Sequence, residues 1–185
     1  MKITKNGKDF KNYTNEDGAI NIKENGVILD CGSYSIINCS SENIINCGSY
    51  NIIDCDSYSI INCSSDNIIN CGSDNIINCG SYITIDCGSY NTIDCCSYSI
   101  INCGSYSIIN CDSDNTIKSK GERNVVIRRD VFEIIELKKG QTIKLNGNGI
   151  KGYKVIEDKD EEIEEAIKFL EDKGIVKNGK IIIKK

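Results

Sequence analysis

Hydrophobic and polar positions alternate along the central part of the chain within a period of eight residues. Between Cys31 and Lys118 one octad is repeated eleven times without insertion or deletion, from Cys-Gly-Ser-Tyr-Ser-Ile-Ile-Asn to Cys-Asp-Ser-Asp-Asn-Thr-Ile-Lys. Position one is always Cys, position three always Ser and position seven always Ile. A strict short period indicates one small unit stacked on copies of itself, so the pattern predicts an all-β fold, a parallel β-solenoid, and not an enzyme-like globule.

Each octad is predicted to form one short strand and one corner. Residues two apart in a strand point to the same face of the sheet, so positions seven, one and three are expected to face the core. Positions six, eight and two are then expected to face solvent. Position four, which is Tyr, Asp or Glu, falls near the corner. Ser, Asp and Asn around it bond to nearby backbone and fit a tight turn.

Two signals disagree on the number of octads in one coil. Position five matches itself in five of eight comparisons made three octads apart, and in two of nine made two octads apart, which favours 24 residues per coil. A triangular coil of that size would leave a wide interior that Cys, Ser and one Ile per side cannot fill. We therefore predict 16 residues per coil, about five and a half coils and a rod of roughly 26 Å at ~4.8 Å per strand.

Residues 1–30 and 119–185 are interpreted as caps on the repeat of residues 31–118, because a solenoid must cover its core and its sheet edges at both ends. In the first cap Ile20, Ile22 and residues 27–29 resemble decayed octads. The second is expected to be a small α+β unit. Its predicted elements are strands at 124–129, 131–137, 142–145 and 153–156, a helix at 159–173, and a hairpin at 175–183.

Charge and composition narrow the function classes. The chain has 185 residues, no His, and a net charge of −5, and the repeat alone carries nine acidic residues against one Lys. A surface of this sign is a poor direct ligand for nucleic acid. The absence of His removes the usual general base, and a convex rod implies no pocket. We therefore predict a protein that is not an enzyme, with no catalytic residues, cofactor or metal.

The cysteines are unusual in number and spacing. Eleven of the twelve occupy position one, and Cys96 occupies an outward position. A spacing of eight residues with no Cys-x-x-Cys pair departs from zinc patterns. The favoured interpretation is a column of small buried hydrophobes. A thiolate ladder for a soft metal such as copper or cadmium is an alternative, as are disulfides between coils. A reducing cytoplasm, expected because no signal peptide or membrane span is seen, disfavours the disulfides.

Three resemblances bear on parts of the chain. The octad of residues 31–38 resembles the Ala-Gly-Tyr-Gly-Ser-Thr-Leu-Thr octad of bacterial ice nucleation proteins, which implies an ice-binding face with paired Thr columns. Position six, however, is Thr only at Thr84, Thr92 and Thr116. The acidic repeat is similar in style to pentapeptide-repeat proteins, some of which mimic duplex DNA, although the five-residue period is absent. The predicted final helix and hairpin look like the end of a winged-helix DNA-binding domain.

The leading functional hypothesis is a non-enzymatic interaction protein that presents a rigid acidic surface to a basic protein partner. The partner would be a nucleic-acid-processing enzyme, and the protein a nucleic-acid mimic or inhibitor from a phage or mobile element. The alternatives are a structural spacer or assembly module and, below it, an ice-binding or soft-metal-binding solenoid. No membrane contact is expected, and a dimer through the C-terminal cap is left open. The predicted contact residues are Asp54, Asp86, Asp94, Tyr82, Tyr90 and Tyr98.

Overall fold

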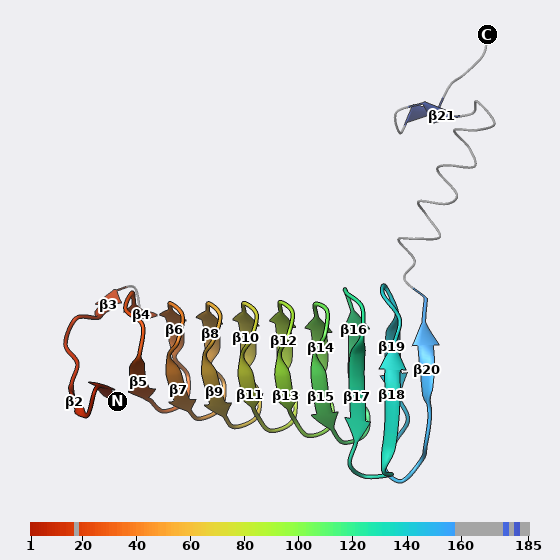
Figure 1. Ribbon diagram of the computed structural model, residues 1–185, viewed down its shortest axis with the longest axis horizontal. Helices are drawn as coiled ribbons and strands as arrows, with labels where there is room; N and C mark the ends of the chain where they lie inside the picture. The colour runs from red at the N-terminus through yellow and green to blue at the C-terminus, as the bar shows by residue number, and fades with distance from the viewer. Residues whose placement is uncertain (17–18, 158–175, 178–179, 182–185) are drawn as a thin grey trace. The chain divides into compact units, whose positions relative to one another are not determined.

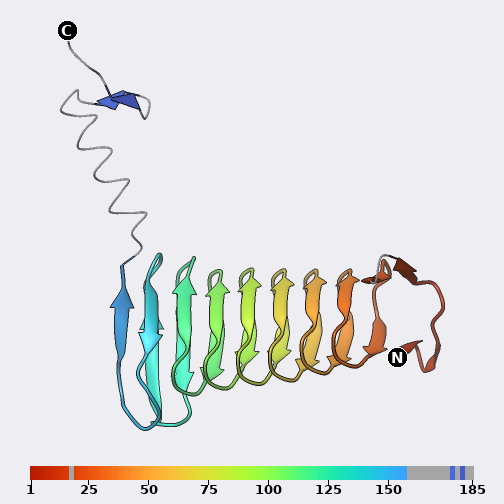
Figure 2. The ribbon, with the colours of Figure 1, turned by 180° about the vertical axis from the view of Figure 1, so that it is seen from behind.

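The computed structural model describes residues 1–16, 19–157, 176–177 and 180–181. Two ten-stranded sheets account for most of them (Figures 1 and 2). Strand β6 (Ile36–Cys39) pairs in parallel with β8 (Ile52–Cys55), with Ile37 opposite Ile53. Strand partners are therefore 16 residues apart. The predicted parallel solenoid with two octads per coil is confirmed, and the 24-residue coil is wrong.

Successive octads alternate between the two sheets, which we call sheet A and sheet B. The parallel strands of sheet A are β5 (Val27–Asp30), β7 (Ile44–Cys47), β9 (Ile60–Cys63), β11 (Ile76–Asn78), β13 (Thr92–Asp94), β15 (Ile108–Cys111) and β17 (Asn124–Arg128). Those of sheet B are β4 (Ala19–Ile22), β6, β8, β10 (Ile68–Cys71), β12 (Thr84–Cys87), β14 (Ile100–Cys103) and β16 (Thr116–Ser119). Each sheet thus has seven parallel strands, because residues flanking the repeat extend the predicted five and a half coils in both directions.

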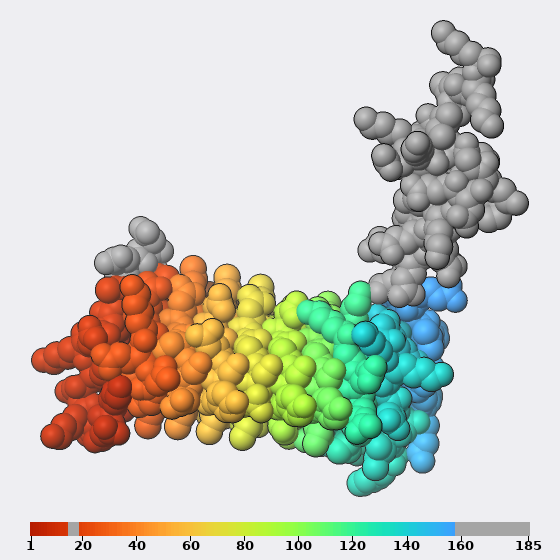
Figure 3. All heavy atoms as spheres, turned by 45° about the horizontal axis from the view of Figure 1, so that its top comes forward, coloured from red at the N-terminus to blue at the C-terminus, as the bar shows by residue number. Residues whose placement is uncertain are grey.

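Both ends of the parallel stack are closed by antiparallel strands. At the N-terminal end these are β1 (Lys2–Lys5), β2 (Lys8–Asp9) and β3 (Thr14–Glu16). At the C-terminal end they are β18 (Glu133–Leu137) and β19 (Thr142–Leu145), with β20 (Tyr153–Ile156) beyond β19 in sheet B. The strands predicted on either side of the repeat are confirmed. Within Met1–Val155 the coils follow one another in chain order, visible as successive bands of colour in Figure 3.

Residues Ile156–Lys185 separate from Met1–Val155 as a second compact unit. In it β21 (Val176–Lys177) pairs antiparallel with β22 (Lys180–Ile181), as predicted for the hairpin. The helix predicted at 159–173 lies outside the described residues. Among the residues that are described, no helix is long and apolar enough to cross a lipid bilayer.

The core is built from positions seven, one and five of the octad. The position-seven side chains, such as Ile69, are fully buried, as predicted. The expectation that position three faces the core was wrong, because most of these Ser side chains are only half-buried at the corner. Position five is buried instead, and Asn51 and Asn67 are each 1% exposed. Positions one, three, five and seven are all odd-numbered, so the alternation of inward and outward side chains alone cannot show where the strand ends and the corner begins.

The buried polar residues at each corner are satisfied by the neighbouring coil. Asn67 Oδ1 accepts a hydrogen bond from the Asn51 amide at 2.7 Å, and Asn51 Nδ2 donates to the Gly48 carbonyl at 2.9 Å. At position three, Ser33 Oγ accepts from the Ser49 amide at 3.0 Å. These bonds recur along the rod and explain why position five tolerates a polar residue in the interior.

Candidate functional site

Position four forms the outer edge of every corner, and its backbone is left-handed in all eleven octads. The φ angle runs from 57° at Tyr106 to 62° at Tyr98. Gly, Asn and Asp adopt this conformation most readily, whereas another residue is strained by about 1–2 kcal/mol. Seven of the eleven corners nevertheless carry Tyr, and the rings remain between 43% (Tyr106) and 80% (Tyr34) exposed. Neither backbone preference nor core packing explains their presence.

Because one coil contains two octads, the corner residues form two columns, one along each edge where the sheets meet. Corner column 1 consists of Tyr34, Tyr50, Asp66, Tyr82, Tyr98 and Asp114. Corner column 2 consists of Glu42, Tyr58, Asp74, Tyr90, Tyr106 and Arg123. Both columns therefore combine aromatic rings with carboxylates.

Neighbouring rings in a corner column stack on each other. The centroids of Tyr90 and Tyr106 are 5.0 Å apart with their planes 1° from parallel, and those of Tyr82 and Tyr98 are 5.3 Å apart at 8°. The separation is close to the ~4.8 Å spacing of adjacent strands, so the solenoid itself sets the rings in register. Stacks of this kind contribute about 0.5–1.5 kcal/mol beyond the area they bury.

A cation already occupies one end of corner column 2. Arg123 has the corner conformation, with φ of 58°, and its guanidinium carbon lies 5.5 Å from the centroid of Tyr106. Arginine over the face of a tyrosine is attracted by the ring quadrupole. The column therefore accepts a guanidinium group within its own chain.

The six predicted contact residues do not form one patch. Asp54 and Asp86 share the outer face of sheet B, separated by one strand, whereas Asp94 lies on sheet A. Tyr82 and Tyr98 are brought together in corner column 1, and Tyr90 lies in corner column 2 on the other edge. The prediction named these residues without grouping them, because grouping requires the assignment of each octad to a sheet.

Two of the predicted aspartates are engaged by basic residues of the C-terminal cap. Lys120 pairs with Asp86 and Arg129 pairs with Asp94. Burial alone would lower the pKa of Arg129, but the carboxylates of Asp112 and Asp94 raise it above its ordinary value. Asp54 lies instead in a shallow hollow of the surface, which Asp56 also lines.

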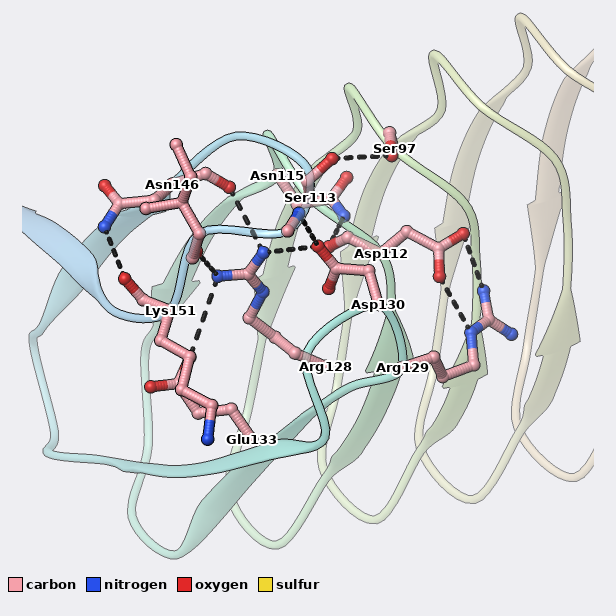
Figure 4. A network of polar contacts seen from close by, with 12 residues as sticks. Ser97, Asp112, Ser113, Asn115, Arg128, Arg129, Asp130, Glu133, Asn146 and Lys151 are labelled. Carbon is pink, nitrogen blue, oxygen red and sulfur yellow. Dashed lines mark hydrogen bonds and ion pairs between the residues drawn. The ribbon is translucent and has the colours of Figure 1, made fainter.

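The C-terminal cap is held by a polar network that the sequence did not reveal (Figure 4). Arg128 is fully buried, and its Nη2 lies 2.7 Å from Asp130 Oδ2. Its Nη1 donates to the Ile150 carbonyl at 2.8 Å. A buried cation requires such partners, so this cluster stabilises the turn between β17 and β18 and the turn before β20. The sequence contained one sign of this cluster: alternation along β17 places the side chain of Arg128 on the buried face.

The outer faces of the sheets give no support to an ice-binding surface. Thr84 pairs with Ile68 and Ile100, and Thr92 pairs with Ile76 and Ile108, so Thr side chains are isolated among Ile along the described strands. Position eight instead forms ladders of amides. On sheet A, Asn62 Nδ2 donates to Asn46 Oδ1 at 2.8 Å and Asn78 Nδ2 donates to Asn62 Oδ1 at 2.8 Å, so this face carries a second ordered column.

All twelve cysteines are free thiols. Burial raises the pKa of the Cys103 thiol to about 11, although the charge of Lys120 opposes the change. Within the described residues no group of three or more His, Cys, Asp and Glu side chains is placed to hold a metal ion. That part of the chain therefore presents no set of ligands for a tetrahedral zinc ion.

No protein family, curated protein or solved structure was found to match this chain. Of the resemblances to ice nucleation and pentapeptide repeats, the structure supports a parallel β-solenoid with 16 residues per coil.

Proposed function

We propose that this protein is a non-enzymatic interaction module whose corner columns bind basic side chains of a partner protein. The observation that carries the proposal is the guanidinium group of Arg123 over the ring of Tyr106, 5.5 Å from its centroid. It supplies, within the chain, an example of the chemistry that a partner would use. A binding role for these columns would account for Tyr at a backbone position that disfavours it.

The order of residues in each column provides a binding slot. In corner column 1, Asp66 lies between Tyr50 and Tyr82, and in corner column 2, Asp74 lies between Tyr58 and Tyr90. Each slot thus offers a carboxylate flanked by aromatic rings, and the rings are at least half exposed. A cation in it would gain a cation–π contact of about 0.5–1 kcal/mol and an exposed ion pair of about 0–1 kcal/mol.

A planar guanidinium suits such a slot better than an ammonium group. It stacks on an aromatic face and at the same time presents donors in its plane to a carboxylate. The solenoid is rigid along the column, so little ordering cost is added when a partner binds. We therefore expect an arginine-rich, extended segment to be preferred over a lysine-rich one.

The test measures binding of an arginine-rich peptide, and of a lysine-rich peptide of equal charge, by calorimetry at two salt concentrations. The double variant Asp66→Asn, Asp74→Asn removes the carboxylate from one slot of each column and should weaken arginine-peptide binding up to about fivefold, which corresponds to ~1 kcal/mol. The matched control is Asp54→Asn, Asp56→Asn, which removes two charges outside the corner columns. Equal losses in both variants, or no preference for arginine, would reject the slots and leave only nonspecific charge attraction.

The finer hypothesis, a nucleic-acid mimic or inhibitor, is supported only by the negative charge of the repeat. It requires the partner to be a nucleic-acid-binding protein, so duplex DNA should compete with this protein for the same partner. Partners captured with the intact protein and lost with the Asp66, Asp74 double variant are the ones to use in that competition.

A further inference from the structure

The two sheets do not end at the same level at the C-terminal end of the rod. The last coil of parallel strands consists of β16 in sheet B and β17 in sheet A, and one further strand, β18, follows β17. Two further strands, β19 and β20, follow β16, so sheet B extends one strand beyond sheet A. Figures 1 and 2 show β20 lying beyond β18 and β19. Among the described strands this end is therefore a step, with β18 and β20 as its two open edges.

Strand β20 is exposed on both of its faces. In β17 alternate residues are buried, whereas all four residues of β20 are exposed. Tyr153 and Val155 share one face of β20 and Lys154 lies on the other, because alternate side chains of a strand point to opposite faces. Among the described residues, no strand of sheet A lies opposite β20. The apolar pair of Tyr153 and Val155 therefore lacks a covering layer, and Val155 is 58% exposed.

The open edge at β18 also carries exposed apolar side chains. Ile134 on its outer face is 74% exposed, and Phe132 in the turn before it is 92% exposed. Single exposed apolar residues are ordinary, but several large ones beside an open strand edge are typical of an association surface. Glu136 lies on the same face of β18 as Ile134 and is also exposed, so this edge presents a carboxylate as well.

The N-terminal end has the opposite step, but its edges are protected. In the described sheets β1 and β2 precede β5, whereas β3 alone precedes β4, so here sheet A extends one strand beyond sheet B. Strand β2 consists of Lys8 and Asp9, both exposed, and β3 has three residues. Short edge strands and charged edge residues hinder pairing with another chain. Head-to-tail stacking of copies is therefore disfavoured, which leaves the C-terminal end to pair with itself.

We propose that two copies of this chain associate through their C-terminal steps, about a two-fold axis that exchanges the two sheets. Sheet A of each copy continues as sheet B of the other, so β18 of one copy lies beside β20 of the second. The two β20 strands then lie opposite each other, and Tyr153 and Val155 of one copy cover those of the other. Such an interface is isologous, so the assembly closes as a dimer and does not grow into a filament.

Charge and shape favour this pairing over one that joins each sheet to itself. Strand β18 carries Glu133 and Glu136, whereas β20 carries Lys154. In the proposed dimer Glu136 of each copy lies beside Lys154 of the other on the outer face. Joining β18 to β18 would instead bring carboxylates together, and the projecting β20 strand of each copy would occupy the place of the other copy's β19. Unlike charges are thus paired only when the sheets are exchanged.

The test measures the mass of the full-length, fully reduced chain by sedimentation equilibrium over a range of concentrations, at low and at high salt. The parent should form a species of twice the chain mass and none larger. Val155→Lys should leave a monomer, because it sets two ammonium groups against each other across the axis. The matched control Ile68→Lys changes an exposed residue on the outer face of β10, which is 46% exposed, and should remain dimeric. Far-UV circular dichroism checks that each variant is folded.

A charge exchange identifies the strands that pair. Glu136→Lys and Lys154→Glu should each raise the dissociation constant roughly tenfold at low salt, since each removes both intermolecular ion pairs. The double variant Glu136→Lys, Lys154→Glu should restore the parent value, because both pairs form again with their charges reversed. A parent chain that stays monomeric, an assembly that grows beyond the dimer, a dimeric Val155→Lys variant or a double variant no tighter than the single ones would each overturn the proposal. None of these outcomes depends on whether the corner columns bind a basic partner.

Discussion

Arg129 Nε lies 3.2 Å from Asp112 Oδ1 while another nitrogen of the same guanidinium pairs with Asp94, one coil earlier. A single side chain therefore joins the end of β17 to two positions of the repeat. The carboxylates that the charge pattern suggested for a partner are in part used to hold the solenoid to its own C-terminal cap.

Neutralising Asp94 should lower stability slightly, whereas neutralising Asp54 should not. An exposed ion pair contributes about 0–1 kcal/mol, so Asp94→Asn is expected to cost at most ~1 kcal/mol and to be most visible at low salt. Asp54 occupies the same octad position as Asp94, but none of the described ion pairs joins it to the C-terminal cap. Asp54→Asn therefore removes the same charge without breaking such a contact. Urea denaturation of both variants at two salt concentrations makes the comparison, and equal costs would contradict it.

A charge introduced at a buried position-seven Ile should prevent folding, whereas a charge at the exposed residue beside it should be tolerated. Ile69 is 0% exposed, and Ile69→Asp would bury a carboxylate without a partner. Ile68 is 46% exposed on the outer face of the same strand, so Ile68→Asp is the matched control. Circular dichroism and analytical gel filtration should show an unfolded or aggregated Ile69 variant beside a folded Ile68 variant. Two folded variants would contradict the inward assignment of position seven.

The buried amides at position five should matter more than the exposed amides at position eight. Asn51→Ala removes the side chain that donates to Gly48 and that accepts from the amide of Ser35, which lies 2.8 Å from Asn51 Oδ1. The Gly48 carbonyl keeps Asn67 Nδ2 as a donor, but the Ser35 amide loses its partner, and leaving such a group unpaired costs about 1–3 kcal/mol. Asn70→Ala changes the same residue type on the exposed face and should cost less than ~0.5 kcal/mol. Thermal melts of the two variants provide the measurement.

Stability should fall at alkaline pH because the folded state holds thiol protons more tightly than the unfolded state. The pKa of Cys103 is raised from 9.0 to about 11 by burial. Below the ordinary pKa both states keep this proton, and between the two values only the unfolded state loses it, so unfolding becomes more favourable as pH rises from about 9 to about 11. Urea midpoints should decline over that interval, and Cys103→Ser should flatten the decline. A variant with the parent slope would contradict this account.

The fold was largely predictable because one physical constraint is repeated. Invariant Ile at position seven identifies the core face, and the small volume of Cys, Ser and Ile limits the coil to two facing strands. Position five was predicted only as part of the turn because Asn and Ser are polar, and its burial depends on hydrogen bonds from the next coil that no single octad displays. The antiparallel caps were predictable as strands, but their direction depends on pairing across the chain.

The candidate site was less accessible to sequence reasoning. The tyrosines of position four were visible, but their grouping into two columns requires the coil size, which decides whether Tyr82 neighbours Tyr90 or Tyr98. Asp86 pairs with Lys120 and Asp94 with Arg129, residues more than thirty positions apart in the chain. No local sequence pattern predicts these ion pairs. Arg128 broke the expected polar and apolar alternation, and that departure marks the buried network of the cap.

The assignment of alternate octads to opposite sheets constrains how the gene for such a chain can change length. Loss or gain of sixteen codons by unequal recombination removes or adds one complete coil, and every later strand keeps its sheet and its partners. Loss of eight codons transfers every later strand to the other sheet. A loss before β13 would leave the strands from β13 to β19 together, with Arg129 still beside both of its aspartates, but the later part of each corner column would then continue the other column. Steps of two octads therefore change only the length of the two corner columns, whereas steps of one octad also exchange their later parts.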